Sequence, residues 1–237
     1  MKFILIGLFA ISNIVYASQH TCDETSLSHK YYKICFNKKT KLAHWVSYNL
    51  DEKMFRGQTR RTNKFKVDPL IPKDSPKPDY YKGSGYDRGH LAPAGDMRID
   101  TTAMKESFFM TNISPQEPSF NRGVWKRLEN LMRSLTQSNK TYTVVTGPLF
   151  EFKPKSFKTR FLNIPKFFYK LIFYKDKYEV KVLAYLLPNE VSKRPLSDFL
   201  VTVDEIERRS GIDFFKNLPI TTQNKIESQI DTGAWGL

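Results

Sequence analysis

The 237-residue sequence has few cysteines, few long apolar runs and no repeated segments. Its two cysteines, Cys22 and Cys35, form no Cys-x-x-Cys pair, which argues against a zinc ribbon. Beyond residue 17 no run reaches the roughly 18 apolar residues that a membrane-spanning helix needs, so no membrane span is expected. The absence of internal repeats, low-complexity tracts and an evident domain boundary makes one domain the simplest organisation.

The one clear apolar run lies at the N-terminus. Met1-Lys2 gives a charged start, residues 3–11 are apolar, and residues 15–17 end in a small Ala at a cleavage position. This pattern is typical of a secretory signal peptide and is too short for a membrane span. We therefore predict a signal peptide at 1–17, a single domain at 18–237, and an exported protein that is periplasmic or secreted.

Acidic residues are scarce relative to basic ones. The chain has 38 Lys and Arg against 24 Asp and Glu, a formal net charge of +14, and a sequence pI of about 9.6. This surplus points to a polyanionic partner, with nucleic acid first and acidic lipid or cell wall second. The alternative is a basic exported protein whose lysines are simply solvated.

Both cysteines follow the predicted signal peptide. An oxidising compartment favours a structural disulfide between Cys22 and Cys35, which contributes about 3 kcal/mol in the chain-entropy model. The surrounding residues 21–40 are polar and are predicted to be irregular. His20 and His29 lie in or beside this stretch, and we expect both at the surface without a metal role.

The remaining pattern predicts an α+β fold with a mixed or antiparallel central sheet flanked by helices. Aromatic and β-branched content predicts strands, and apolar spacing and capping residues predict helices. The expected strands cover 42–50, 142–148, 167–174 and 178–185, the last two joined by a turn at 175–177; the expected helices cover 103–110, a segment from 121, and 202–211. Prolines between 69 and 78 predict an extended, helix-free loop up to Gly83.

Residues 86–93 hold the densest group of chemically active side chains. Asp87, Arg88, Gly89 and His90 are consecutive and are expected on a short strand. Because side chains alternate along a strand, Arg88 and His90 share one side and Asp87 points to the other. A histidine beside an arginine suits phosphoryl chemistry, with one group to take a proton and one to hold anionic oxygens. A lone histidine would more commonly be packed or at the surface.

Two further segments could serve the same chemistry. Residues 51–66 interleave arginines and lysines, including Arg60 and Arg61, with phenylalanines, which suits a groove for phosphates and bases; a solvated charged loop is an equal alternative. On the helix from 121, Asn121 and Glu129 are separated by about 80°, so both can face one cleft. The plain alternatives are a helix N-cap at Asn121, a role open also to Ser119, and a solvated charge at Glu129.

Three motifs occur in order along the chain. They are Asp87-Arg88-Gly89-His90, Asn112-Ile113-Ser114-Pro115-Gln116, and Asn121-Arg122-Gly123 followed by Trp125, Leu128 and Glu129. Together they closely resemble the DNA/RNA non-specific endonuclease family of ββα-metal nucleases. The similarity extends from the strand near Trp45 to residues 201–207, nearly the whole mature chain. The resemblance implies an α+β fold with a ββα-metal motif.

The resemblance also implies roles for individual residues. By this resemblance, His90 corresponds to the family's general base, which deprotonates the attacking water. Asn121 resembles the single direct protein ligand of the metal, and Glu129 resembles the residue that orients metal-bound water. Asn112 resembles the asparagine that steadies the site and the His90 ring, and Arg88 a phosphate or transition-state contact. Substrate contacts are expected from four arginines: Arg60, Arg61, Arg88 and Arg122. Of the adjacent pair we choose Arg61, which opens the Arg-x-x-x-Phe-x-x-Asp-Pro run; Asp87 is expected to be a structural hydrogen-bond acceptor.

The implied activity is hydrolysis of DNA and RNA with Mg²⁺, for which Mn²⁺ is a candidate substitute, leaving 5′-phosphate ends. One amide ligand with water and phosphate suits Mg²⁺, and a neutral imidazole suits a base near neutral pH. A homodimer and a protein inhibitor are further expected partners. The alternative is a non-catalytic exported nucleic-acid-binding protein. Such a binder needs neither His90 nor Asn121.

Overall fold

A computed structural model describes residues 22, 24–151, 154–157 and 162–237. The predicted signal peptide at 1–17 and His20 lie outside the described residues. Within the described part, every helix is too short or too polar to cross a bilayer.

The described residues form a seven-stranded sheet in which all neighbouring strands are antiparallel. In spatial order the strands are β1 (Thr25–Ser28), β2 (Tyr32–Asn37), β3 (Leu42–Leu50), β6 (Tyr142–Leu149), β7 (Phe167–Lys175), β8 (Val180–Pro188) and β9 (Leu200–Val201). The four strands predicted from aromatic and β-branched content are therefore present, and the α+β prediction is confirmed. The β7–β8 turn lies slightly later than predicted, because the Asp176 carboxylate accepts hydrogen bonds from the backbone N–H groups of Tyr178 and Glu179.

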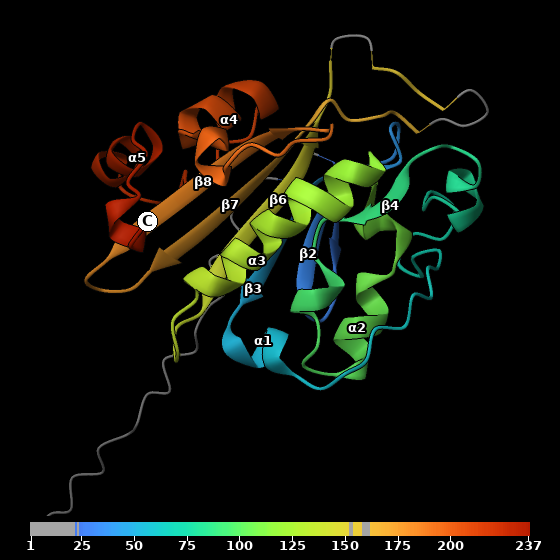
Figure 1. Cartoon of the computed structure of the whole chain (residues 1–237), viewed down its shortest axis with the longest axis horizontal. Coiled ribbons are helices and arrows are strands. Elements are labelled where there is room, and N and C mark those ends of the chain that lie inside the picture. Colours follow the sequence, from blue (N-terminus) through green and yellow to red (C-terminus); the bar gives the residue numbers. More distant parts are fainter. Residues whose placement is uncertain (1–21, 23, 152–153, 158–161) are drawn as a thin grey trace, which may run out of the picture.

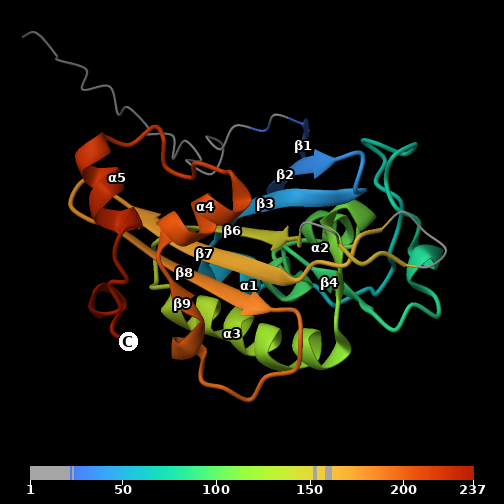
Figure 2. The ribbon, with the colours of Figure 1, turned by 90° about the horizontal axis from the view of Figure 1, so that it is seen from above.

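Helices cover both faces of this sheet. They are α1 (Glu52–Arg56), α2 (Thr101–Ser107), α3 (Lys126–Leu135), α4 (Val203–Ser210) and α5 (Ile220–Glu227). Figure 1 shows α3 crossing in front of the sheet, and Figure 2 shows the sheet between α3 on one side and α4 with α5 on the other.

Alternation along the strands explains this three-layer arrangement. Successive side chains of a strand point to opposite faces. On β7, Phe168 and Ile172 join the apolar cluster of α3, whereas Tyr169 and Leu171 join the cluster that includes residues of α4 and α5. Because both faces are covered, β7 reads as an almost continuous apolar run instead of an alternating one.

A separate two-stranded sheet pairs β4 (Asp87–His90) with β5 (Ile113–Gln116). The chain then enters a π-helical segment, Phe120–Trp125, which continues directly into α3. Two short strands followed by a helix form the ββα unit that the sequence motifs implied.

Three local expectations were wrong. Residues 21–40 are not irregular, because β1 and β2 pair within them. The proline-rich loop is not free of helix, since Pro78–Tyr81 forms a 3₁₀ turn. The helix expected at 103–110 starts earlier, because the Asp100 side chain accepts the N–H of Ala103. These segments are rich in polar residues, so their hydrophobic periodicity is too weak to predict the strands, the turn or the helix start from the sequence.

His29 was expected at the surface and is instead buried. Its side chain is 3% exposed, and its Nε2 lies 2.9 Å from Oδ2 of Asp68. The ring also contacts those of Tyr32 and Phe109, at centroid distances of 4.7 and 5.2 Å. A carboxylate partner and two aromatic neighbours stabilise a histidine that its polar sequence neighbours made look solvated.

Cys22 and Cys35 form the expected disulfide, which ties the chain before β1 to the middle of β2. We predict that the Cys22→Ala/Cys35→Ala variant loses about 3 kcal/mol of unfolding free energy. The bridge joins residues 13 positions apart in the sequence, and the loop that it closes restricts the unfolded chain. Urea denaturation of both proteins, with reduced wild type as the control, measures this loss. Equal midpoints for the variant and the oxidised wild type would contradict the prediction.

Candidate active site

The β4–β5 hairpin depends on a glycine at its closest point. Gly89 pairs with Ser114, and the side chain of Gln116 packs directly over it. A Cβ added at Gly89 would lie 2.1 Å from Oε1 of Gln116, far inside contact distance. Glycine therefore lets β4 approach β5 closely, and this close pairing fixes the direction of the neighbouring His90.

The segment that carries Asn121 is π-helical instead of α-helical. Gly123 interrupts the helix with φ −106° and ψ −106°. Neither Asn121 nor Ser119 caps the helix, as the Glu117 carboxylate accepts the N–H of Phe120 and the Glu117 carbonyl accepts that of Asn121. The amide side chain of Asn121 is thereby left available for another role.

A cleft of about 410 Å³ gathers side chains from the first and third motifs, while the second motif lies behind it in β5. Its lining comes from the loop after α1, from β4 and the turn that follows, and from the π-helical segment with α3. The lining residues are Arg61, Arg88, His90, Pro93, Ala94, Gly95, Asn121, Arg122, Lys126, Glu129, Asn130 and Arg133. His90 and Asn121 therefore share one cavity.

Asp87 connects the strand to the helix at this cleft. Its carboxylate accepts a hydrogen bond from Nδ2 of Asn121 at 2.8 Å and two from Arg122, at 2.8 and 2.6 Å. Burial acts to raise the pKa of Asp87, but these hydrogen bonds and the charges of Arg122 and Arg88 outweigh it, so the pKa is lowered. Because a carboxylate only accepts, the amide nitrogen of Asn121 must face Asp87. No hydrogen bond to the amide oxygen is seen from the residues that the structure describes.

His90 is buried between aromatic rings. Its ring contacts Phe108 edge-on at 4.9 Å and Phe65 at 5.5 Å. Among the described residues Nε2 has no hydrogen-bond partner and is enclosed, which leaves Nδ1 as the nitrogen that can reach the cleft. Burial, with the charges of Arg61 and Arg88, lowers the pKa of His90 to about 3, so the imidazole is neutral at neutral pH.

Asn112 supports the strand next to His90 without touching the imidazole by a hydrogen bond. Its amide pairs with Ala92 in both directions, accepting the Ala92 N–H and donating to the Ala92 carbonyl, each at 2.9 Å. It also donates to the Ser107 carbonyl. Asn112 is 0% exposed, so these three bonds fix the backbone that follows β4.

The arginines expected at the substrate fall into different positions. Arg61 and Arg88 line the cleft, whereas Arg60 lines a separate depression beside α2. Arg88 lies over the ring of Phe65, with its guanidinium carbon 4.2 Å from the centroid. Arg122 reaches the cleft but its guanidinium group is held by Asp87. Of the adjacent pair, Arg61 lines the cleft, and Arg60 is not among its lining residues.

A buried polar network holds Glu129. Arg133, one helical turn later, lies 3.9 Å from Glu129 and 2.6 Å from Asp96. Asp96 in turn accepts the hydroxyl of Tyr48 at 2.7 Å. Burial raises the pKa of Glu129, and the charge of Lys170 on β7 opposes this most strongly.

Lys170 and Asp96 were not singled out from the sequence. Lys170 is 0% exposed, and its ammonium group donates to Thr146 Oγ1 at 2.7 Å and lies 4.8 Å from the ring centre of Trp125. A lysine in the middle of the apolar run 167–174 was the available signal. A buried lysine needs an anionic or hydrogen-bonding partner, and the charge of Glu129 acts to raise the pKa of Lys170 against the effect of burial.

A second hollow of about 450 Å³ adjoins the cleft and shares Arg88 and Asn121 with it. Aromatic and charged side chains line it together: Phe65, Pro78, Asp79, Tyr81, Lys82, Tyr86, Asp87, Arg88 and Asn121. We refer to the two hollows, which share Arg88 and Asn121, as the groove; rings and cations line its walls.

Comparison with known proteins agrees with this geometry. The family model for DNA/RNA non-specific endonucleases matches residues 12–220. Nuclease C1 of Cunninghamella echinulata var. echinulata is 36% identical over 217 residues, covering 83% of this chain and 84% of that protein. Human mitochondrial endonuclease G is 34% identical over 206 residues, covering 81% of this chain and 69% of that protein.

A crystal structure of an EndoG/EndoGI complex has a similar fold. The match has a TM-score of 0.76 at 29% identity and covers 83% of this chain and 88% of that one. The family is divalent-metal dependent, and the amide oxygen of Asn121 is a suitable ligand. The chain with this cleft belongs to the DNA/RNA non-specific endonuclease family and is a DNA/RNA endonuclease.

Proposed function

We propose that this chain is an exported, Mg²⁺-dependent endonuclease that hydrolyses phosphodiester bonds of both DNA and RNA and leaves 5′-phosphate ends. The observation that carries the proposal is the shared cleft of His90 and Asn121. A protein that only bound nucleic acid would need neither the enclosed neutral imidazole nor the oriented amide.

His90 acts as the general base. A low pKa keeps its imidazole neutral, and the accessible Nδ1 takes a proton from the attacking water. Phe65 and Phe108 hold the ring in place by contact on two sides. Asn112 acts indirectly, because its bonds to Ala92 fix the backbone immediately after the strand that carries His90.

Asn121 holds the metal ion through its amide oxygen. Asp87 orients that amide by accepting its N–H group, and a neutral ligand leaves the charge of the ion uncompensated. When bound, the ion supplies Lewis-acid stabilisation of the phosphate and its leaving oxygen. Mg²⁺ is the proposed ion because it keeps most of its water and needs few protein ligands, and Mn²⁺ is the proposed substitute.

Three other side chains assist at the phosphate. Arg61 and Arg88 contact its non-bridging oxygens, where planar guanidinium groups offer paired donors. Glu129, which lies 3.9 Å from Arg133 and is influenced by the charge of Lys170, is available to orient water by accepting its hydrogen bonds. Arg122 has a smaller role at the substrate, since Asp87 occupies its guanidinium group.

The groove accounts for the broad substrate range. Cations hold a phosphate backbone without reading sequence, and aromatic faces stack on any base. Tyr86 and Phe65 line the groove beside Arg88, where they suit unpaired or distorted strands of either sugar. The formal net charge of +14 extends this attraction over the surface.

Export is proposed from the N-terminal sequence and from the disulfide. The charged start, the apolar run at 3–11 and Ala17 suit a secretory signal. The Cys22–Cys35 bridge suits an oxidising compartment, either the periplasm or the exterior. By likeness to the EndoG/EndoGI complex, a protein inhibitor is a proposed partner. A second copy of this chain, forming a homodimer, is another proposed partner.

Replacing His90 by Ala removes the proposed base. We predict a fall in kcat of about 10²–10⁴-fold, the usual contribution of general base catalysis, with DNA retention largely unchanged. Plasmid nicking and a gel-shift assay at matched protein concentration measure the two effects. His44→Ala, at a half-buried ring on β3, is the matched control, and unchanged turnover in His90→Ala would remove His90 from the mechanism.

Removing the metal or its ligand tests Asn121. We predict that EDTA abolishes nicking and that Asn121→Ala raises the Mg²⁺ concentration for half-maximal activity by about tenfold or more, the scale of changes at metal sites. The control is Asn130→Ala, which lines the same cleft but whose oxygen accepts from Arg133. A nuclease fully active in EDTA, or equal Mg²⁺ titrations for both variants, would contradict the assignment.

Salt dependence tests the groove. Phosphate contacts release counterions, so the logarithm of the DNA-binding constant should fall steeply and linearly with the logarithm of the salt concentration. We predict that Arg88→Ala lowers the magnitude of that slope by about one, the effect of one lost phosphate contact. Arg209→Ala, on α4 across the sheet, should leave the slope unchanged. Binding that is insensitive to salt would rule out an extended basic groove.

A further inference from the structure

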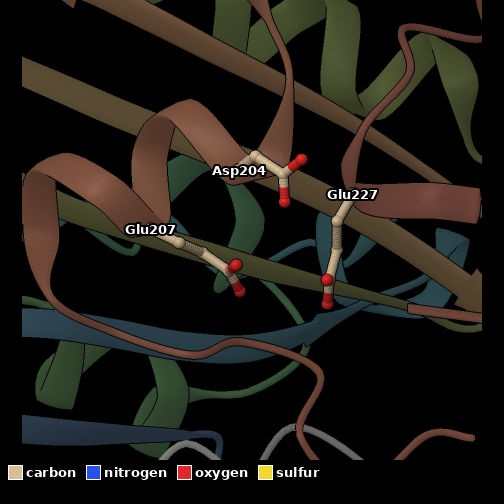
Figure 3. Close-up of side chains that lie close together, drawn as sticks. All are labelled: Asp204, Glu207 and Glu227. Atoms are coloured by element: carbon tan, nitrogen blue, oxygen red, sulfur yellow. The ribbon is translucent and has the colours of Figure 1, made fainter. Parts of the chain in front are cut away.

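Three carboxylates meet on the side of the sheet that faces away from α3. Asp204 and Glu207 lie one turn apart on α4, and Glu227 is the last residue of α5. One oxygen from each lies within 4.8 Å of the others. Figure 3 shows the three side chains close together, Asp204 and Glu207 from α4 and Glu227 from α5.

None of the three carboxylates takes part in an ion pair with any described residue. This contrasts with Glu205 on the same helix, whose carboxylate is held by both Arg208 and Arg209.

Glu227 is the decisive member. Its residue is only 7% exposed, and among the described residues its Oε1 is enclosed without a hydrogen-bond partner. Enclosing a carboxylate oxygen without a partner is costly. The neighbouring Ile226 belongs to the apolar cluster on this face, so water access is limited from that side.

The three negative charges also repel one another. Burial and the charges of Glu207, Asp204 and Asp213 raise the pKa of Glu227 to about 7. Glu207 is partly compensated, because its Oε1 accepts the N–H of Phe214 at 2.7 Å. Its remaining oxygen, with those of Asp204 and Glu227, still lacks a positive partner among the residues described.

We propose that Asp204, Glu207 and Glu227 bind a calcium ion that joins α4 to α5. An all-oxygen, all-carboxylate set suits a hard divalent cation. Calcium–oxygen distances of about 2.3–2.6 Å let one ion bridge ligands up to ~5 Å apart. The three carboxylate oxygens lie within 4.8 Å of one another and so fall inside that span.

The ion acts on the C-terminal part of the fold and not on the cleft. It neutralises the repulsion between the two helices and satisfies Oε1 of Glu227. Because α4 and α5 pack on the opposite face of the sheet from α3 (Figure 2), the site is separate from His90 and Asn121. The proposal holds whichever ion serves hydrolysis.

Calorimetric titration with CaCl₂ tests the proposal in an Asn121→Ala background, which removes the proposed metal ligand of the cleft. We expect one site with a Kd of roughly 10⁻⁴–10⁻³ M, the range of extracellular calcium modules. The same protein should gain a few degrees in Tm at saturating calcium. No heat and no Tm shift up to about 10 mM, tenfold above that range, would overturn the proposal.

Two variants locate the ion. Glu227→Gln keeps the shape of the side chain and should weaken calcium binding by about tenfold or more, because ligand charge sets affinity. Asp204 is exposed, so Asp204→Asn changes no buried group and should weaken calcium binding similarly. Glu205→Gln is the matched control on the same helix and should bind calcium like its parent.

Two results would contradict the assignment to this cluster. Equal calcium affinity in Glu227→Gln, Asp204→Asn and Glu205→Gln would place the ion elsewhere. A calcium-insensitive parent that Glu227→Gln stabilises would show instead that Glu227 carries its own proton. Magnesium-dependent nicking by Glu227→Gln, without the Asn121 change, should remain within about twofold of wild type, since additive effects are expected at distant sites.

Discussion

The contact between Asp87 and the segment Asn121–Arg122 is the interaction on which the cleft depends. It joins β4 to the start of the helix by three hydrogen bonds from two consecutive residues. Without it, the strand that carries His90 and the helix that carries Asn121 would be linked mainly by the β4–β5 pairing and by apolar packing. The same carboxylate determines which atom of the Asn121 amide faces the cleft, so one acidic side chain sets both the distance and the orientation.

Behind this contact lies a buried chain of polar groups that runs from the sheet to α3. Tyr48 on β3 donates to Asp96, Asp96 binds Arg133, and Arg133 approaches Glu129. Such networks are stabilising only when every member has a partner. Here the partners come from a strand, a 3₁₀ turn and a helix, which places α3 against the sheet in one orientation. The position of Glu129 therefore depends on this network between the sheet and α3, and not on the walls of the substrate groove.

The sequence predicted the parts of this protein that have strong local patterns. Runs of β-branched and aromatic residues revealed β3, β6, β7 and β8, and Thr202 correctly marked the start of α4. The first and third motifs predicted a common cleft, and His90 and Asn121 both line one. Roles that depend on contacts between distant segments escaped, as with the carboxylate partner of His29 and the burial of Lys170. No local pattern encodes such pairs.

The π-helical turn at Phe120–Trp125 has a geometric consequence for the groove. In a regular α-helix, Asn121 and Glu129 would differ in direction by about 80°. Here a π-type turn takes up one additional residue, and Gly123 breaks the helical backbone within it. The direction of Asn121 relative to Glu129 is therefore set by this interruption and not by regular helical spacing. Shortening this turn by one residue would swing Asn121 out of register with Glu129 while leaving every side chain of the motif present.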